Sequence, residues 1–176
     1  SQTAGYKQFT LGDAGSSSKI FSLYKARDGY LYAGSSDGLY RFDGKVFKKM
    51  PFADNNVADT VTAIHQDNKG SFWVGFQSGN IAIMDKNKLA YIYPEEGTPK
   101  KKITCFAEDK NGNLWIATAG EGIYYFKGKR LYLINENEGL GDLNVHALAA
   151  SASGDIIAAT DNGIAICHIS ENKKEV

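Results

Sequence analysis

The sequence predicts an all-β fold, a β-propeller built from about four four-stranded antiparallel blades. The composition suits short strands and tight turns, because the 176 residues include 19 Gly, 10 Tyr and 9 Phe but only 3 Pro. A pattern of apolar segments and turn glycines also returns four times, in steps of about 42 residues. A period of about 40 to 45 residues with four strand-like segments per unit is typical of propeller blades, which bury each other's faces.

The register of the repeat rests on four positions that keep their chemistry. Each unit opens with a β-branched residue, carries a glycine in its first turn, has an aromatic or apolar residue three positions later, and has a second glycine before its third strand. In that order, the positions are Ile20, Val61, Ile103 and Val145; Gly29, Gly70, Gly112 and Gly154; Tyr32, Trp73, Trp115 and Ile157; and Gly38, Gly79, Gly122 and Gly163. The glycines are therefore interpreted as turn residues of a scaffold.

The whole chain, 1–176, is expected to form one propeller segment. Its blades are expected at residues 19–60, 61–102, 103–144 and 145–170. The third blade shows the pattern most clearly and predicts strands at 103–108, 114–118, 123–126 and 130–134.

The ends of the repeat leave two arrangements open. The fourth unit lacks a clear fourth strand, whereas residues 6–11 ("YKQFTL") look like a spare outer strand. That strand could complete the fourth unit and close a ring, or the chain could be part of a seven- or eight-bladed propeller, which is the favoured arrangement. An incomplete ring exposes strand edges and apolar faces, which predicts a homo-oligomer formed through the blade edges, such as two four-bladed halves that make eight.

Charge and cysteine content argue against several classes of partner. With 20 Lys and Arg against 20 Asp and Glu, nothing indicates a nucleic-acid or membrane-surface partner. No apolar run approaches the roughly 20 residues of a membrane-spanning helix, and the first residues do not resemble a signal peptide. Cys105 and Cys167 are too few for a disulfide framework or a zinc site, and both are predicted to be small core residues. No metal or other cofactor is expected.

Candidate binding residues lie in the turns between the second and third strands of the blades, because loops on a rigid scaffold commonly carry binding sites. Phe76 is a candidate to stack on a sugar ring, with Gln77 and Glu121 as hydrogen-bonding groups. The alternative for Phe76 is a turn residue that folds back over its own blade. Gly120 is interpreted as an inserted residue, which lengthens this turn in the third blade relative to the other three.

No catalytic residues are predicted. Asp67 and Asp109 suggest a carboxylate pair at first sight, but each lies in its own first turn, where an Asp side chain caps local backbone amides. "GEG" at 120–122 lacks the following helix that a phosphate-binding loop needs. His146 is a single histidine near the start of a strand and predicts no metal or acid–base site.

Two units and one linker resemble the two-component regulator propeller repeat. They are "VTAIHQDNKGSFWVGFQSGNIAI" (61–83), "ITCFAEDKNGNLWIATAGEGIYYF" (103–126) and "NEGLGDLNVHAL" (137–148). The resemblance covers residues 19–170 and is closest in the third unit. Residues that match the turn Asp, the Trp and the Thr of the repeat are Asp67 and Asp109, Trp73 and Trp115, and Thr118 and Thr160; the departures are Tyr32, Ser151 and Ile157.

This resemblance implies a function that the strands alone do not. Such repeats usually occur in the extracytoplasmic sensor part of bacterial hybrid histidine kinases, many of which are thought to sense glycans. It thus implies a non-catalytic, periplasmic sensor region of a membrane-anchored parent, with an oligosaccharide or another small ligand as partner. The alternatives are a propeller enzyme acting on polysaccharide, which would need convergent carboxylates, histidines or a metal on one face, and a protein-interaction scaffold similar to WD-repeat propellers, whose Trp-Asp dipeptide is missing here.

Overall fold

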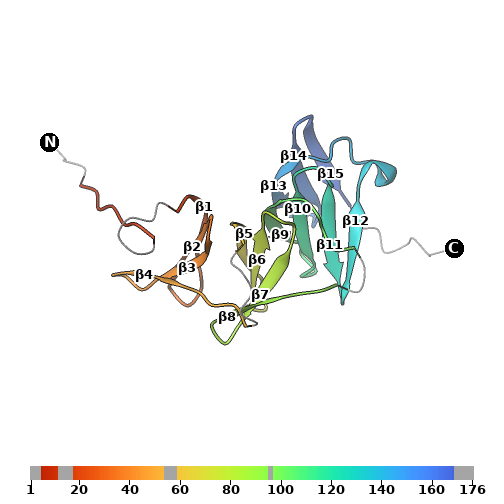
Figure 1. The fold of residues 1–176 in the computed structure, drawn as a ribbon. Coiled ribbons are helices and arrows are strands. Elements are labelled where there is room, and N and C mark those ends of the chain that lie inside the picture. Colours follow the sequence, from red (N-terminus) through yellow and green to blue (C-terminus); the bar gives the residue numbers. More distant parts are fainter. Residues whose placement is uncertain (1–4, 12–17, 54–58, 95–96, 169–176) are drawn as a thin grey trace.

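The computed structural model describes residues 5–11, 18–53, 59–94 and 97–168, which form four small antiparallel sheets that follow one another in an arc (Figure 1). The first blade consists of β1 (Ile20–Lys25), β2 (Leu31–Ser35), β3 (Gly38–Phe42) and β4 (Phe47–Lys49). The second consists of β5 (Val61–Gln66), β6 (Phe72–Phe76), β7 (Ile81–Asp85) and β8 (Lys88–Tyr91). The third consists of β9 (Ile103–Glu108), β10 (Leu114–Thr118), β11 (Ile123–Lys127) and β12 (Arg130–Ile134). The fourth consists of β13 (Val145–Ala150), β14 (Ile156–Thr160) and β15 (Gly163–Cys167).

The predicted all-β architecture of four antiparallel blades is confirmed. In each blade the strands pair in sequence order. Three of the four predicted strands of the third blade have the predicted bounds, and β11 is one residue longer than expected. The fourth blade has three strands within the described residues, and positions 169–170 of the expected blade lie outside them.

The core lies between successive blades, because each blade presents one apolar face to each neighbour. Three buried clusters correspond to the three contacts between blades, and each holds side chains from both partners. Trp115 is 1% exposed and packs in the cluster between the third and fourth blades, as a wedge. Cys105 and Cys167 pack against the same cluster as small half-buried residues, and burial raises the pKa of the Cys105 thiol to about 11.

The inner strands hold the blades in register. The Thr62 hydroxyl donates to the carbonyl of Ile103 in the next blade, at 2.6 Å. The Thr104 hydroxyl donates in the same way to the carbonyl of Val145, also at 2.6 Å. Each bond joins the inner strand of one blade to the inner strand of the next, so it fixes the position of one blade relative to its neighbour along the strand direction.

The N-terminal segment differs from the expectation. Residues 6–11 form no strand; instead Phe9 packs edge-on against Phe42 and Phe47, and Leu11 is buried against Ala33 and Tyr40. Figure 1 shows the physical reason: the segment lies beside the first blade, whereas β15 lies at the other end of the arc. A strand forms by pairing with the edge of a sheet, and the free edge of the fourth blade, β15, is not beside this segment.

Candidate functional site

The turns between the second and third strands share one face with the connections to the next blade. The Thr60 hydroxyl, on one such connection, donates to the carbonyl of Ser36 in the turn of the first blade, at 3.1 Å. In the third blade the amide of Lys100 donates to Glu121 Oε2, at 2.9 Å. We call this side of the molecule the loop face.

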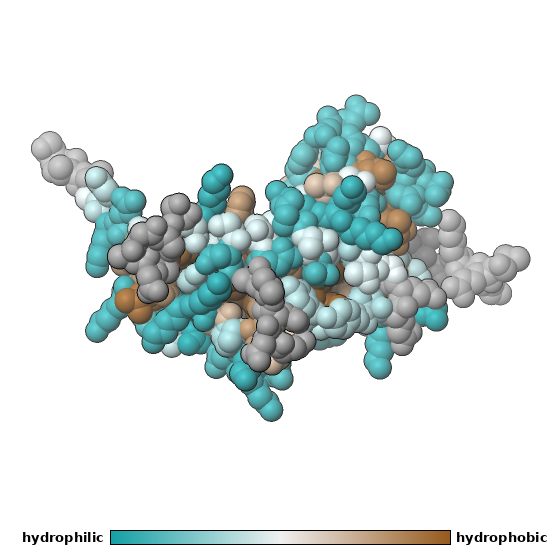
Figure 2. Space-filling view, in the orientation of Figure 1, coloured by the Kyte–Doolittle hydropathy of each residue, from teal (hydrophilic) through white to brown (hydrophobic). Residues whose placement is uncertain are grey.

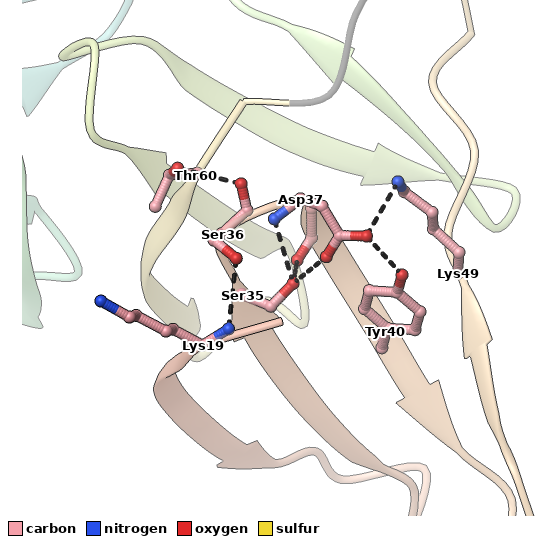
Figure 3. Close-up of polar contacts among 8 residues, drawn as sticks. Lys19, Ser35, Ser36, Asp37, Tyr40, Lys49 and Thr60 are labelled. Atoms are coloured by element: carbon pink, nitrogen blue, oxygen red, sulfur yellow. Dashed lines mark hydrogen bonds and ion pairs between the residues drawn. The ribbon is translucent and has the colours of Figure 1, made fainter. Parts of the chain in front are cut away.

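In the first blade the loop face carries a closed polar cluster around Asp37 (Figure 3). Asp37 accepts hydrogen bonds from the hydroxyls of Ser35 and Tyr40, each at 2.7 Å, and Lys49 Nζ lies 3.4 Å away. Burial alone would raise the pKa of Asp37, but these hydrogen bonds and the lysine charge outweigh it and lower the pKa to about 2. The carboxylate is thus held by its own blade and serves the scaffold.

The third blade repeats this arrangement with Glu121 and Tyr124. The Tyr124 hydroxyl donates to Glu121 Oε2 at 3.3 Å, and the side chain of Tyr124 is 5% exposed. Burial first, and then the Glu121 charge, raises the pKa of Tyr124 to about 12. The amides of Gly120 and Gly122 both donate to the carbonyl of Leu143, at 3.0 and 2.9 Å, so the connection to the fourth blade is anchored on this turn.

A hollow of about 230 Å³ opens between this turn and that connection. Its lining combines the predicted residues Gly120 and Glu121 with Tyr124, Leu133, Asn135, Glu136, Asn137 and Leu143. Asn135 begins a short 3-10 helix (Glu136–Glu138) through a capping box with Glu138, which fixes the polar rim of the hollow. The site therefore offers the two carboxylates of Glu121 and Glu136, side-chain amides and apolar leucine side chains within a rigid frame.

Phe76 is not available for the stacking role that the sequence suggested. It is the last residue of β6 rather than a turn residue, it is 0% exposed, and it packs against Phe52 and Tyr91. The equivalent positions, Ser35 and Thr118, are buried as well, and their hydroxyls bond to turn carbonyls. In the second blade an apolar ring takes the same buried place, so Phe76 is a core residue.

Gln77 lies in the exposed turn after β6 and does not line the hollow, whose lining comes from the third blade. The strand register also corrects the expectation that Gly120 lengthens one turn alone. Gly75 pairs with Ile81 just as Ala117 pairs with Ile123, so the second and third blades have equally long turns. In the first and fourth blades the turn is one residue shorter.

Asp67 and Asp109 cap their turns, as predicted, and each also holds a tryptophan. Asp109 Oδ1 accepts from the amides of Asn111 and Asn113, and its Oδ2 accepts from Trp115 Nε1 at 3.0 Å. Asp67 makes the same bond to Trp73 Nε1, at 2.9 Å. Burial would raise the pKa of both carboxyls, but the indole and amide donors outweigh it and lower the pKa. These carboxylates are structural.

Two histidines complete the polar residues of interest. His146 is exposed and hydrogen-bonds to Asp161 in the turn of the fourth blade. His65 is half-buried between the rings of Tyr24 and Phe106, and burial lowers its pKa against the opposing effect of nearby carboxylates.

Among the described residues, no three His, Cys, Asp or Glu side chains are grouped as metal ligands would be. The described part of the chain also contains no helix that could span a membrane.

The residues that sequence reasoning missed are Tyr124 and the rim residues Asn135 and Asn137. Tyr124 could have been found from its match to Tyr40, because each follows a turn that contains an acidic residue. The capping pattern of Asn135 and Glu138 could have located the short helix. Their contact with Gly120 depends on how the connection folds back, which no local pattern reports.

Comparisons with known proteins agree with this fold. The model of the two component regulator propeller family matches residues 97–120, which include β9 and β10. A search of curated proteins returned no match. The extracellular domain of BT3049, assigned to a hybrid two component system of B. thetaiotaomicron, superposes with a TM-score of 0.74 at 23% identity, over 89% of this chain and 22% of that one.

Two further structures show the same fold. The extracellular domain of BT4673 of B. thetaiotaomicron, assigned to a one component system, gives a TM-score of 0.75 at 19% identity, over 96% of this chain and 22% of that one. The computationally designed Ika4 protein gives 0.66 at 18%, over 95% of this chain and 100% of that one. The chain thus spans about a fifth of the two bacterial domains. It is a β-propeller segment in which residues 97–120, including β9 and β10, match the model of the two component regulator propeller family.

Proposed function

We propose that this chain belongs to the extracytoplasmic sensor region of a two-component signalling protein and that it acts by binding a ligand, without catalysis. The parent would be anchored in the inner membrane, with this segment in the periplasm and a histidine kinase on the other side. The family match in the third blade and the likeness to extracellular domains of bacterial signalling proteins support this assignment.

The observation that carries the proposal is the hollow at Gly120 and Glu121. Its volume of about 230 Å³ is below the roughly 300–1,000 Å³ of common small-molecule pockets. It would take one terminal sugar ring of an oligosaccharide, with the rest of the chain in solvent. Glu121, Asn135 and Asn137 would bond to ring hydroxyls, since carboxylates and side-chain amides suit both their donors and their acceptors.

Isothermal titration calorimetry with short neutral and acidic oligosaccharides tests this proposal. Glu121→Ala should weaken binding of a positive probe about tenfold or more, the equivalent of one charged hydrogen bond. Asp37→Asn is the matched control, because Asp37 holds the same place in the first blade and does not line the hollow. No heat with any probe, or binding that survives both Glu121→Ala and Asn137→Ala, would refute the assignment of the site.

A further inference from the structure

The two ends of the arc expose apolar positions that every internal blade contact buries. Leu39, Ile81 and Ile123 hold one position of the third strand and are at most 2% exposed, because the next blade covers them. The same position in the fourth blade is Ile164, which is 76% exposed. Figure 2 shows hydrophobic surface at both the first-blade and the fourth-blade ends.

The first blade exposes the complementary half of this contact. The residue that opens each inner strand is Val61, Ile103 or Val145 in the later blades, and each is 0% exposed. In the first blade it is Ile20, which is 49% exposed. The two end faces therefore carry the two halves of the contact that joins blades within the chain.

Among the described residues the fourth blade ends at β15, and a cavity lies at this outer edge of the blade. The cavity measures about 470 Å³ and lies beside Tyr125, Ile134, Leu140 and Cys167. In the second and third blades the fourth strand fills the corresponding space with Leu89 and Leu131, which are buried against the preceding blade. Within the described residues, no strand of the fourth blade supplies this side chain.

The N-terminal segment has the register of that strand. Phe9 lies eleven residues before Ile20, just as Met50, Ile92 and Ile134 lie eleven before the openings of the later blades. Tyr6 then corresponds to the cavity-filling position of Leu89 and Leu131. Phe9 already packs on the first blade, at 4.8 Å from the ring of Phe42, whereas Tyr6 is 94% exposed.

We propose that two copies of this chain join head to tail and that residues 6–9 of each copy form the fourth strand of the partner's fourth blade. The β11–β12 pairing of Phe126 with Leu131 then predicts Tyr6 opposite Cys167 of the other copy, in the cavity. Ile20 covers the end face that carries Ile164. Such an interface joins unlike faces, and it closes into a ring of eight blades, within the range of known propellers.

The oligomeric state in solution tests the interface. Sedimentation equilibrium should find a species of twice the 19.2 kDa chain mass. Ile20→Glu and Ile164→Glu should each give monomers with unchanged circular dichroism, and a mixture of the two variants should regain a dimer through the one unaltered contact. Val46→Glu is the matched control, since Val46 is 51% exposed in the turn after β3 and should leave the dimer intact.

A cross-link tests the strand exchange even where a charged variant misfolds. In a Cys105→Ser background, Tyr6→Cys should form a disulfide with Cys167 of the other copy under mild oxidation, because directly paired strand residues lie within disulfide reach. Lys7→Cys, whose side chain points to the other side of the strand, should stay unlinked. A monomer at all concentrations, a disulfide that joins the Tyr6→Cys thiol to Cys167 of its own chain, or a ladder of open polymers would each overturn the proposal.

Discussion

The bond between Asp109 and Trp115 should be a main support of the third blade. Trp115 is 1% exposed, and its indole N–H donates to Asp109 Oδ2 at 3.0 Å. Asp109→Ala leaves that buried donor unpaired, at a cost of about 1–3 kcal/mol, and removes two amide bonds in a partly exposed turn, at about 0.5 kcal/mol each. We therefore expect the free energy of unfolding to fall by about 2–4 kcal/mol.

A double-mutant cycle separates the two contributions. In a Trp115→Phe background no indole is orphaned, so Asp109→Ala should cost only about 1 kcal/mol, and the coupling energy should be about 1–3 kcal/mol. Urea unfolding followed by circular dichroism measures all four proteins at one concentration, because self-association would shift the apparent stability.

The fourth blade provides the control for this cycle. Ser151 occupies the place of Asp109 there, accepting one bond from the amide of Asp155, and Ile157 replaces the tryptophan. Ser151→Ala should therefore cost about 1 kcal/mol or less. An equal loss from Asp109→Ala in both backgrounds would refute the reasoning, since the bond to the indole would then contribute nothing.

Three further outcomes follow from the structure. Gly122→Ala should destabilise the fold by about 1–3 kcal/mol more than Gly29→Ala in urea titrations. Both glycines have φ near +86°, but only at Gly122 would an added Cβ meet the Ile134 carbonyl oxygen, at 2.5 Å. Equal losses of stability in the two variants would contradict this account. Phe76→Ala should lower the free energy of unfolding by about 3–5 kcal/mol in guanidinium, whereas Tyr93→Ala, at a residue that is 77% exposed, should lower it little. A negligible loss of stability in Phe76→Ala would contradict the place of Phe76 in the core. The folded-state pKa of Asp37, about 2, lies below its ordinary 3.8, so the carboxylate stabilises the fold above pH 3.8 and this contribution is lost as the pH falls toward 2. In Asp37→Asn the urea midpoint of unfolding should depend less steeply on pH between about pH 4 and pH 2 than in the unaltered protein. An unchanged pH dependence would show that the carboxylate is not held as described.

Local features of this protein were predictable because they depend on neighbours in the sequence. The strands of the third blade follow from apolar segments between turn glycines, and the capping role of Asp109 follows from its place in a tight turn. The wedge position of Trp115 follows from the repeat itself, because a large ring in every central blade must pack between sheets.

Features that depend on alignment between strands were not predictable in the same way. Glycine positions suggested one long turn at Gly120, but hydrogen-bond pairing shows an equally long turn at Gly79, which sits one residue earlier relative to its strand. Phe76 looked like a turn residue for the same reason. One misplaced residue in a strand register moves a side chain from the core to the surface.

The sequence by itself determined the all-β repeat, its period and the turn chemistry of each blade. Only the tertiary structure decided that Phe76 is buried, that Gly120 and Glu121 face Asn137 across a hollow, and that Ile164 lies bare at one end of the arc. The physical reason is that burial is a property of what packs against a face. A repeat specifies the same face four times, and the position of each blade in the arc decides whether that face is covered.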